Sequence, residues 1–213
     1  MAKELATAIG YTFVDTGAMY RAVTLLALRH DLFKVDGSID EDQLCILLTQ
    51  NSVTQQYNPQ LRISETFLNG ENVESVIRTM QVSERVSQLA TLPFVRTEMV
   101  KQQQAMGQHG GIVMDGRDIG TTVFPHAEMK VFVTARAEVR AQRRYLELQS
   151  KGQEVTFEDV LKNLQERDYI DSHRKVSPLR QADDAVVFDN TNLTRTEQAA
   201  MLLALFKERC ILH

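Results

Sequence analysis

One stretch near the N-terminus has residue types that could bind a phosphorylated ligand. Residues 15–21 read Asp-Thr-Gly-Ala-Met-Tyr-Arg and follow a short β-rich segment. Because ligands gather at the carboxyl ends of strands in a parallel sheet, Asp15 lies where a site is expected. Gly17 permits close backbone approach, Thr16 offers a hydroxyl at a helix start, and Arg21 lies one turn into that helix. The same spacing fits a helix cap followed by a surface arginine equally well.

A second junction of this kind spans residues 114–120, which read Met-Asp-Gly-Arg-Asp-Ile-Gly. Its first acid, Asp115, closes a nearly continuous apolar run, a position at which phosphate-transfer enzymes hold Mg²⁺ directly or through water. Arg117 could grip a phosphate as a bidentate fork, which a lysine could not reproduce. The alternative is a glycine-bounded turn whose charges are solvated.

A third group of charged residues lies within residues 167–174, which read Arg-Asp-Tyr-Ile-Asp-Ser-His-Arg. On a helix, Arg167, Asp171 and Arg174 fall on one face. Two arginines around an acid could bracket a phosphorylated ribose, although taken alone such a pattern is more often a solvated, salt-bridged face. Three further arginines, Arg140, Arg143 and Arg144, could contact a nucleotide, but a basic helix face is the preferred interpretation.

These groups require a scaffold in which strands alternate with helices. Strand patterns occupy residues 11–15, 111–115, 130–134 and 185–189, and the apolar runs among them are typical of a parallel sheet covered on both faces. Helical spacing is found at residues 1–9, 18–30, 41–50, 73–109 with a break at Pro93, 137–149, 157–174 and 194–211. Gly10 is predicted to end the first of these helices. Alternation within residues 52–69 predicts a hairpin turned near Asn58-Pro59. The pattern predicts an α/β fold with a doubly wound parallel sheet.

Composition narrows the class of protein further. The 213 residues are 43% hydrophobic and 24% charged, which suits a globular α/β domain with an insertion. The net charge of −4 provides no basic field for a nucleic acid partner. Neither a membrane-length apolar run nor a signal peptide is visible, and the five histidines show no metal-binding spacing. Cys45 and Cys210 fall in apolar helical contexts, which predicts buried, reduced thiols and a cytoplasmic location.

Five segments together resemble one known family, bacterial cytidylate kinase. In chain order they read DTGAMYRA (15–22), SVIRT (75–79), VSQLATLPFVR (86–96), DGRDIGTTVFP (115–125) and RDYIDSHRKVSPL (167–179). The resemblance covers essentially the whole chain. Other nucleoside monophosphate kinases share the architecture, but the DGRD-IGT-VFP run and the long insertion are typical of the cytidylate branch.

The resemblance implies a role for each matching position. The cytosine edge would be read by Ser87, Arg96 and Asp118. The acceptor's phosphate would be held by Arg21, Arg117 and Arg174, with Thr16 where the family has a serine or threonine. Ribose contacts would come from Asp171 and Arg167. Among these, the residues that would stabilise charge during catalysis are Arg117, Arg174 and Arg167, and Mg²⁺ would be held by Asp115, with Asp15 as a weaker candidate.

The implied reaction is phosphoryl transfer from ATP to CMP or dCMP with Mg²⁺, in a cytoplasmic and monomeric enzyme without nucleic acid or membrane partners. The implied organisation is a core of residues 1–32, 81–150 and 179–213, a monophosphate-binding insertion of residues 33–80 and a helical lid of residues 151–178.

One part of the family pattern is absent. Kinases of this class open with a strand and G-x-x-x-x-G-K-[ST], whose amides and lysine cradle the donor phosphates, and residues 1–213 contain no such motif. The opening residues resemble the helix that follows it, so we expect the central first strand to be missing and this chain to be inactive. A start codon placed at an internal methionine explains this better than a genuine truncated product, because the downstream motifs are intact. The alternative function is a non-catalytic nucleotide-binding or interaction protein that retains only the acceptor half.

Overall fold

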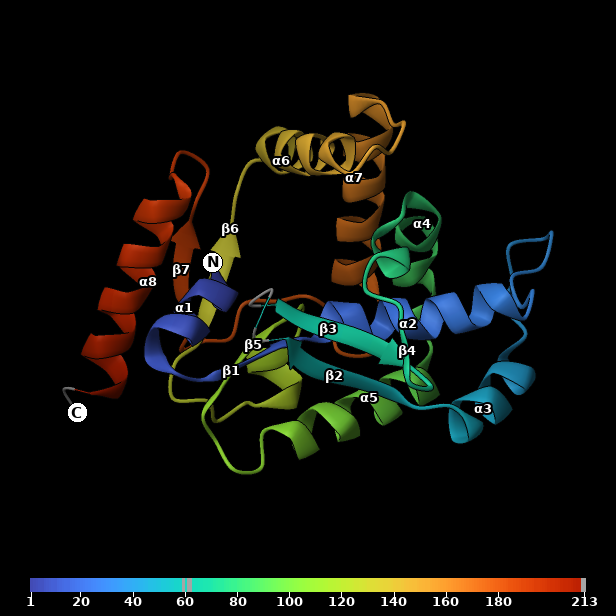
Figure 1. Ribbon diagram of the computed structural model, residues 1–213, viewed down its shortest axis with the longest axis horizontal. Coiled ribbons are helices and arrows are strands. Elements are labelled where there is room, and N and C mark those ends of the chain that lie inside the picture. Colours follow the sequence, from blue (N-terminus) through green and yellow to red (C-terminus); the bar gives the residue numbers. More distant parts are fainter. Residues whose placement is uncertain (59, 61–62, 212–213) are drawn as a thin grey trace. The chain divides into compact units, whose positions relative to one another are not determined.

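The computed structural model describes residues 1–58, 60 and 63–211. They fall into two compact units, Thr12–Gly116 and the combination of Met1–Tyr11 with Arg117–His213, and each unit is described by itself (Figure 1). Within the described ranges, no helix has the length and apolar character needed to cross a membrane.

The Thr12–Gly116 unit combines a parallel strand pair, an antiparallel sheet and four helices among its described residues. Its helical elements are α2 (Thr16–Arg29), α3 (Glu41–Gln50), the 3-10 turn η1 (Val76–Arg78), α4 (Met80–Leu89) and α5 (Pro93–Met106). Its strands are β1 (Thr12–Asp15), β2 (Val53–Asn58), β3 (Ile63–Leu68), β4 (Glu71–Asn72) and β5 (Ile112–Asp115). Strands β1 and β5 pair in parallel with Asp15 opposite Asp115, and β2–β3–β4 form the antiparallel sheet.

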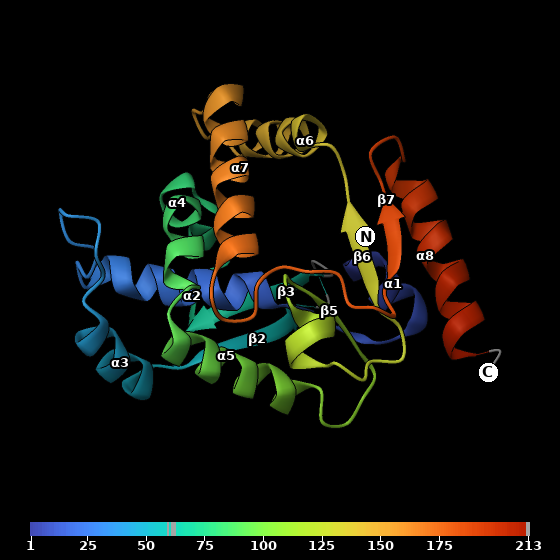
Figure 2. The ribbon, with the colours of Figure 1, turned by 180° about the vertical axis from the view of Figure 1, so that it is seen from behind.

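Helix α2 is the centre of this unit's core. It is apolar around most of its circumference, and Ala18, Met19, Ala22 and Val23 are completely buried. The helix contacts α4, α5 and the β2–β3 pair, and both views show it running alongside that pair (Figures 1 and 2). Residues at the start of α2 are therefore held rigidly by packing on several sides.

The other unit is built on a second parallel pair, β6 (Val131–Thr134) with β7 (Val186–Asp189). Its helical elements are α1 (Ala2–Ile9), the short π-helical turn η2 (Ile119–Val123), α6 (Ala137–Ser150), α7 (Phe157–His173) and α8 (Arg195–Cys210). Helix α8 lies beside β7 in both views, and α6 packs on α7 (Figures 1 and 2). Gly10 ends α1 in the left-handed conformation, at φ 73°, as the sequence predicts.

The α/β class with parallel strands is confirmed, but the predicted burial is wrong in places. Among the described residues the parallel strands form two separate pairs, and Val133 and Val187 are 42% and 53% exposed. The faces of a parallel sheet are buried by the helices that cover them, so these exposed valines lie where no described element covers the β6–β7 pair. Both cysteines are free, but Cys45 is exposed rather than buried. The hairpin is confirmed by the pairing of β2 with β3, while Pro59 of its predicted turn lies outside the described residues.

Candidate functional site

The predicted site residues divide between the two units. The Thr12–Gly116 unit carries Asp15, Thr16, Arg21, Ser87, Arg96 and Asp115. The other unit carries Arg117, Asp118, Arg167, Asp171 and Arg174.

The junction between β1 and α2 has the capping geometry. Asp15 Oδ1 accepts a hydrogen bond from the Ala18 amide at 2.9 Å, and Oδ2 accepts one from Arg78 Nη2 at 2.8 Å. Thr16 is buried and its hydroxyl donates to the Asp115 carbonyl at 2.8 Å. A Thr16 hydroxyl that donates to a substrate phosphate would first have to leave this carbonyl, because it carries one proton.

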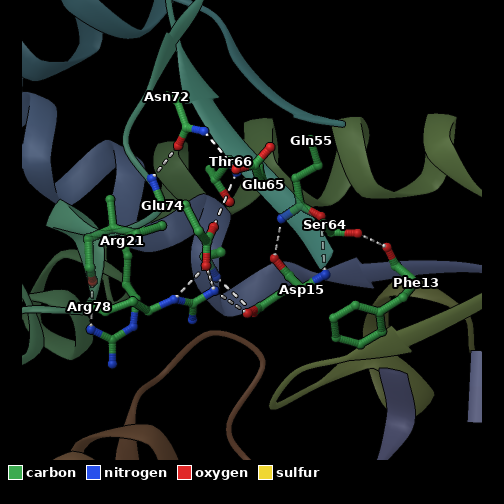
Figure 3. A network of polar contacts seen from close by, with 12 residues as sticks. Phe13, Asp15, Arg21, Gln55, Ser64, Glu65, Thr66, Asn72, Glu74 and Arg78 are labelled. Carbon is green, nitrogen blue, oxygen red and sulfur yellow. Dashed lines mark hydrogen bonds and ion pairs between the residues drawn. The ribbon is translucent and has the colours of Figure 1, made fainter. Parts of the chain in front are cut away.

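Arg78 joins this junction to the hairpin region, a link that sequence reasoning missed (Figure 3). Its guanidinium lies 2.8 Å from Asp15 Oδ2 and 2.6 Å from Glu74 Oε1. Glu74 Oε2 in turn accepts a hydrogen bond from the Thr66 amide at 3.1 Å. Burial alone would lower the pKa of Arg78, but the two carboxylates outweigh it and raise that pKa. Arg78 is therefore a charged tie between η1, β1 and β3.

Two further side chains bind β1 on the edge that faces the hairpin (Figure 3). Gln55 Oε1 accepts a hydrogen bond from the backbone N–H of Asp15 at 3.1 Å, and Gln55 Nε2 donates one to the Asp15 carbonyl at 2.6 Å. Ser64 Oγ donates to the Phe13 carbonyl at 2.9 Å. These side chains satisfy backbone groups that a neighbouring strand would otherwise pair. The hairpin thus fixes the end of β1 from which the site residues project.

Arg21 is a buried residue and not the surface arginine that the sequence left as an alternative. Its Nη1 donates to the Ile77 carbonyl at 3.1 Å and to Ser83 Oγ at 2.8 Å. A buried arginine is uncommon unless it is paired or functional. Its position one turn into the central helix α2 therefore supports a binding role.

Arg96 and Ser87 are also buried in this unit. The Arg96 guanidinium lies 5.7 Å from the centroid of the Tyr20 ring, and its Nη1 donates to the Ala90 carbonyl at 3.3 Å. Ser87 follows Ser83 by one turn on α4. Tyr20 is the neighbour of Arg21 on α2, while Ser87 lies on α4 and Arg96 on α5. The packing of α2 with α4 and α5 therefore holds three of the predicted residues, Arg21, Ser87 and Arg96.

In the other unit, charged residues from segments 115–118 and 167–174 form a cluster, called the acid–arginine cluster below. Its members are Arg117, Asp118, Asp168, Asp171 and Arg174. Arg117 Nε lies 3.2 Å from Asp171 Oδ2, and Arg117 Nη1 lies 3.2 Å from Asp168 Oδ1. Arg174 Nη1 lies 3.3 Å from Asp171 Oδ1, and Arg174 Nη2 lies 3.9 Å from Asp118 Oδ1. Asp118, Asp171 and Arg174 are buried, so the solvated helix face is wrong for this part of α7.

Arg167 adjoins the same cluster. Burial and, to a smaller extent, the nearby charge of Arg117 lower its pKa to about 10. The sequence predicts a basic helix face for Arg140 but contains no sign of the ion pair of Arg140 Nη1 with Asp168 Oδ2 at 2.6 Å. Only the packing of α6 on α7 brings Arg140 to Asp168, so spacing along either helix carries no signal for it. A region in which the charged arginine is disfavoured is suited to an anionic ligand.

The two residues predicted to hold Mg²⁺, Asp115 and Asp15, differ in their surroundings. Asp115 is exposed at the carboxyl end of β5, whereas both carboxylate oxygens of Asp15 accept protein hydrogen bonds. The part of the chain that the structure describes contains no group of three or more potential metal ligands. Mg²⁺ is commonly bound by one or two carboxylates together with substrate phosphates. Asp115 is more exposed than Asp15, which agrees better with an ion that arrives with a nucleotide.

Comparison with known proteins identifies the family. The sequence profile of the family described as cytidylate kinase matches residues 1–208. Proteins named cytidylate kinase from Porphyromonas gingivalis, Bacteroides thetaiotaomicron and Bacteroides fragilis are 59%, 55% and 54% identical over 209, 206 and 208 residues. These matches cover 97–98% of this chain and 90% of each relative. The resemblance found in the sequence is confirmed, and the chain belongs to the cytidylate kinase family of ATP-dependent nucleoside monophosphate kinases.

Proposed function

We propose that this chain provides the acceptor site of a kinase that transfers a phosphoryl group from ATP to CMP or dCMP, giving CDP or dCDP. The observation that carries the proposal is the acid–arginine cluster, in which Asp118, Asp171 and Arg174 are buried together. Charged side chains are seldom buried unless they are paired, and clusters of buried ionisable groups are frequent at functional sites. The names of the relatives support the choice of cytidine nucleotides.

The proposed chemistry needs positioning rather than a catalytic base. A monophosphate already carries an anionic oxygen, so the protein must align two anions that repel each other and stabilise the charge of a loose transition state. We assign the acceptor's phosphate to Arg21, Arg117 and Arg174, and the ribose to Arg167 and Asp171. Arg117, Arg174 and Arg167 would also stabilise charge on the group in transfer.

A nucleotide would compete with contacts already present in the acid–arginine cluster. Asp171 contacts both Arg117 and Arg174, at 3.2 and 3.3 Å. If a ribose hydroxyl donates to Asp171 and a phosphate approaches the two arginines, the acid keeps a partner while the arginines gain an anionic one. These ion pairs would hold the arginines in place until the substrate arrives.

We assign the cytosine edge to Asp118, Ser87 and Arg96. A carboxylate accepts a hydrogen bond from the amino group of cytosine, while a hydroxyl and a guanidinium can donate to its other edge atoms. Thr16 stays a predicted substrate contact, one that requires its hydroxyl to leave the Asp115 carbonyl. Mg²⁺ would enter with ATP near Asp115 and neutralise phosphate charge when bound.

The donor side is where residues 1–213 differ from the family pattern. The sequence contains no G-x-x-x-x-G-K-[ST] motif, so we propose that this polypeptide alone does not turn over ATP and CMP. The described parallel strands form two separate two-stranded sheets.

From the resemblance to the family we also propose the organisation into core, insertion (33–80) and lid (151–178). The monomeric state, the cytoplasmic location and the absence of a nucleic acid partner are proposed in the same way. The alternative of a non-catalytic interaction protein is not favoured, because the family match extends over residues 1–208.

The proposal is tested by coupled measurement of ADP formation with ATP, Mg²⁺ and CMP. Two proteins are compared, the chain of 213 residues and the same chain extended at its N-terminus by a strand and a G-x-x-x-x-G-K-[ST] segment. We expect turnover with CMP only in the extended protein. An extended, folded protein that does not phosphorylate CMP contradicts the assignment, and turnover by the shorter chain contradicts our account of the donor side.

A further inference from the structure

Ser83 is a buried polar residue of α4 that belongs to none of the sequence motifs assigned to the substrate. Only 2% of it is exposed. Its Oγ donates to the Thr79 carbonyl at 3.0 Å and accepts from Arg21 Nη1 at 2.8 Å. A hydroxyl has one proton, and here that proton is directed to Thr79. Ser83 therefore presents a lone pair to Arg21 and acts only as an acceptor towards that residue.

The backbone supplies the second acceptor for the same nitrogen. The Ile77 carbonyl accepts from Arg21 Nη1 at 3.1 Å. Nη1 has two N–H groups, so one acceptor for each fixes both the position of this end of the guanidinium and the orientation of its plane. Ser83 and Ile77 lie 62 and 56 residues from Arg21 in the sequence, but all three belong to the Thr12–Gly116 unit.

We propose that Ser83 is a positioning residue for Arg21, which sets the guanidinium plane for the phosphate of the acceptor nucleotide without touching the nucleotide. The inference rests on the proposed function, in which Arg21 binds that phosphate. Small misplacements of a charged group strongly reduce its benefit to a bound ligand. The contribution of Ser83 is therefore specific to the phosphate and absent for the nucleoside.

Two substitutions separate the acceptor from the volume that it fills. Ser83→Ala removes the oxygen, whereas Ser83→Cys fills a similar space with a weak acceptor. Thr24→Ala is the matched control, because Thr24 is a completely buried hydroxyl on α2 that donates to the Tyr20 carbonyl at 2.8 Å. Thermal unfolding and circular dichroism establish that each variant is folded.

The experiment is a calorimetric titration of the 213-residue chain with CMP and, in parallel, with cytidine. We expect both Ser83 variants to bind CMP about tenfold more weakly while cytidine affinity stays the same. Thr24→Ala should bind both ligands as the parent does. In an Arg21→Ala background, Ser83→Ala should have no further effect on CMP affinity, because Ser83 acts through Arg21.

Each other outcome overturns the inference in a recognisable way. Parental affinity for both CMP and cytidine in both Ser83 variants removes the positioning role and leaves the proposed function intact. An equal loss of CMP and cytidine affinity in both variants shows a general structural role instead. If the parent chain does not bind CMP, the proposed acceptor site fails and the inference fails with it.

Discussion

Arg117 Nε and Asp171 Oδ2 lie 3.2 Å apart, although the sequence assigns these residues to different parts of one nucleotide. The Asp171 side chain is only 4% exposed and also contacts Arg174. The arginine proposed to bind the phosphate and the acid proposed to bind the ribose therefore form an ion pair with each other. Substitution of one residue at a time, followed by measurement of ligand binding and unfolding, can therefore test each assignment.

Removing Asp118 should weaken CMP binding. An unpaired buried polar group costs about 1–3 kcal/mol, so Asp118→Ala should lower CMP affinity by about tenfold or more. Cytidine affinity should fall in parallel, because the contact is with the base. Asp184→Ala removes an exposed partner of Lys130 and serves as the control. Equal CMP affinity of the Asp118 variant and the parent in calorimetry would exclude Asp118 from the site.

Lysine should not replace the phosphate-binding arginines. Arg21→Lys, Arg117→Lys and Arg174→Lys keep the positive charge but lose the bidentate fork. We expect each variant to bind CMP about tenfold more weakly and cytidine as before. In the extended protein, kcat/KM for CMP should fall as well. Parental kinetics in all three variants would show that these arginines do not touch the phosphate.

Arg167 should reduce the stability of the protein without substrate. Its pKa is lowered to about 10, so its charged form is disfavoured in the folded chain. The unfolded chain binds the proton more tightly, so this destabilisation is fully present below pH 10 and disappears as the pH rises towards 12.5. Arg167→Met should raise the free energy of unfolding by about 1 kcal/mol at pH 7.

The same Arg167→Met variant should bind CMP more weakly, because the ribose contact is lost. Unfolding in urea at pH 7 and pH 11, with CMP titrations at pH 7, measures both effects. The stability gain should shrink at the higher pH. A variant that is less stable than the parent at pH 7 contradicts this account of Arg167.

The Arg78 tie should contribute more to the free energy of unfolding than an exposed ion pair of similar geometry does. Arg78→Met leaves Asp15 and Glu74, both partly buried, without their cation, which should cost about 1–3 kcal/mol. Arg29→Met breaks the exposed pair with Glu71 and should cost at most about 1 kcal/mol. Urea unfolding of both variants decides the comparison. Equal losses would mean that the tie adds nothing beyond a surface contact.

Local features of the fold could be predicted because they depend on neighbouring residues. The face shared by Arg167, Asp171 and Arg174 follows from helical spacing, and Gly10 marks the end of α1. Packing between distant segments could not be predicted. Ser83 meets Arg21 only because α4 packs on α2, and the sequence between them contains no sign of it.

The exposure of individual side chains could not be predicted from the sequence either. Val133 and Val187 lie in apolar runs, which indicate buried strands, but their burial depends on what covers the β6–β7 pair. Asp15 shows the same limit at the site, because the sequence allowed both a cap and a ligand position. The Ala18 amide and Arg78 occupy both of its oxygens.

The central claim is that this chain recognises a cytidine monophosphate, and one titration tests it directly. The 213-residue chain is titrated calorimetrically with CMP and with UMP under identical conditions. UMP presents a carbonyl where CMP presents the amino group that Asp118 is assigned to accept from. We therefore predict CMP binding that is at least about tenfold tighter than UMP binding. Equal affinities for the two nucleotides, or no binding of CMP, would contradict the account.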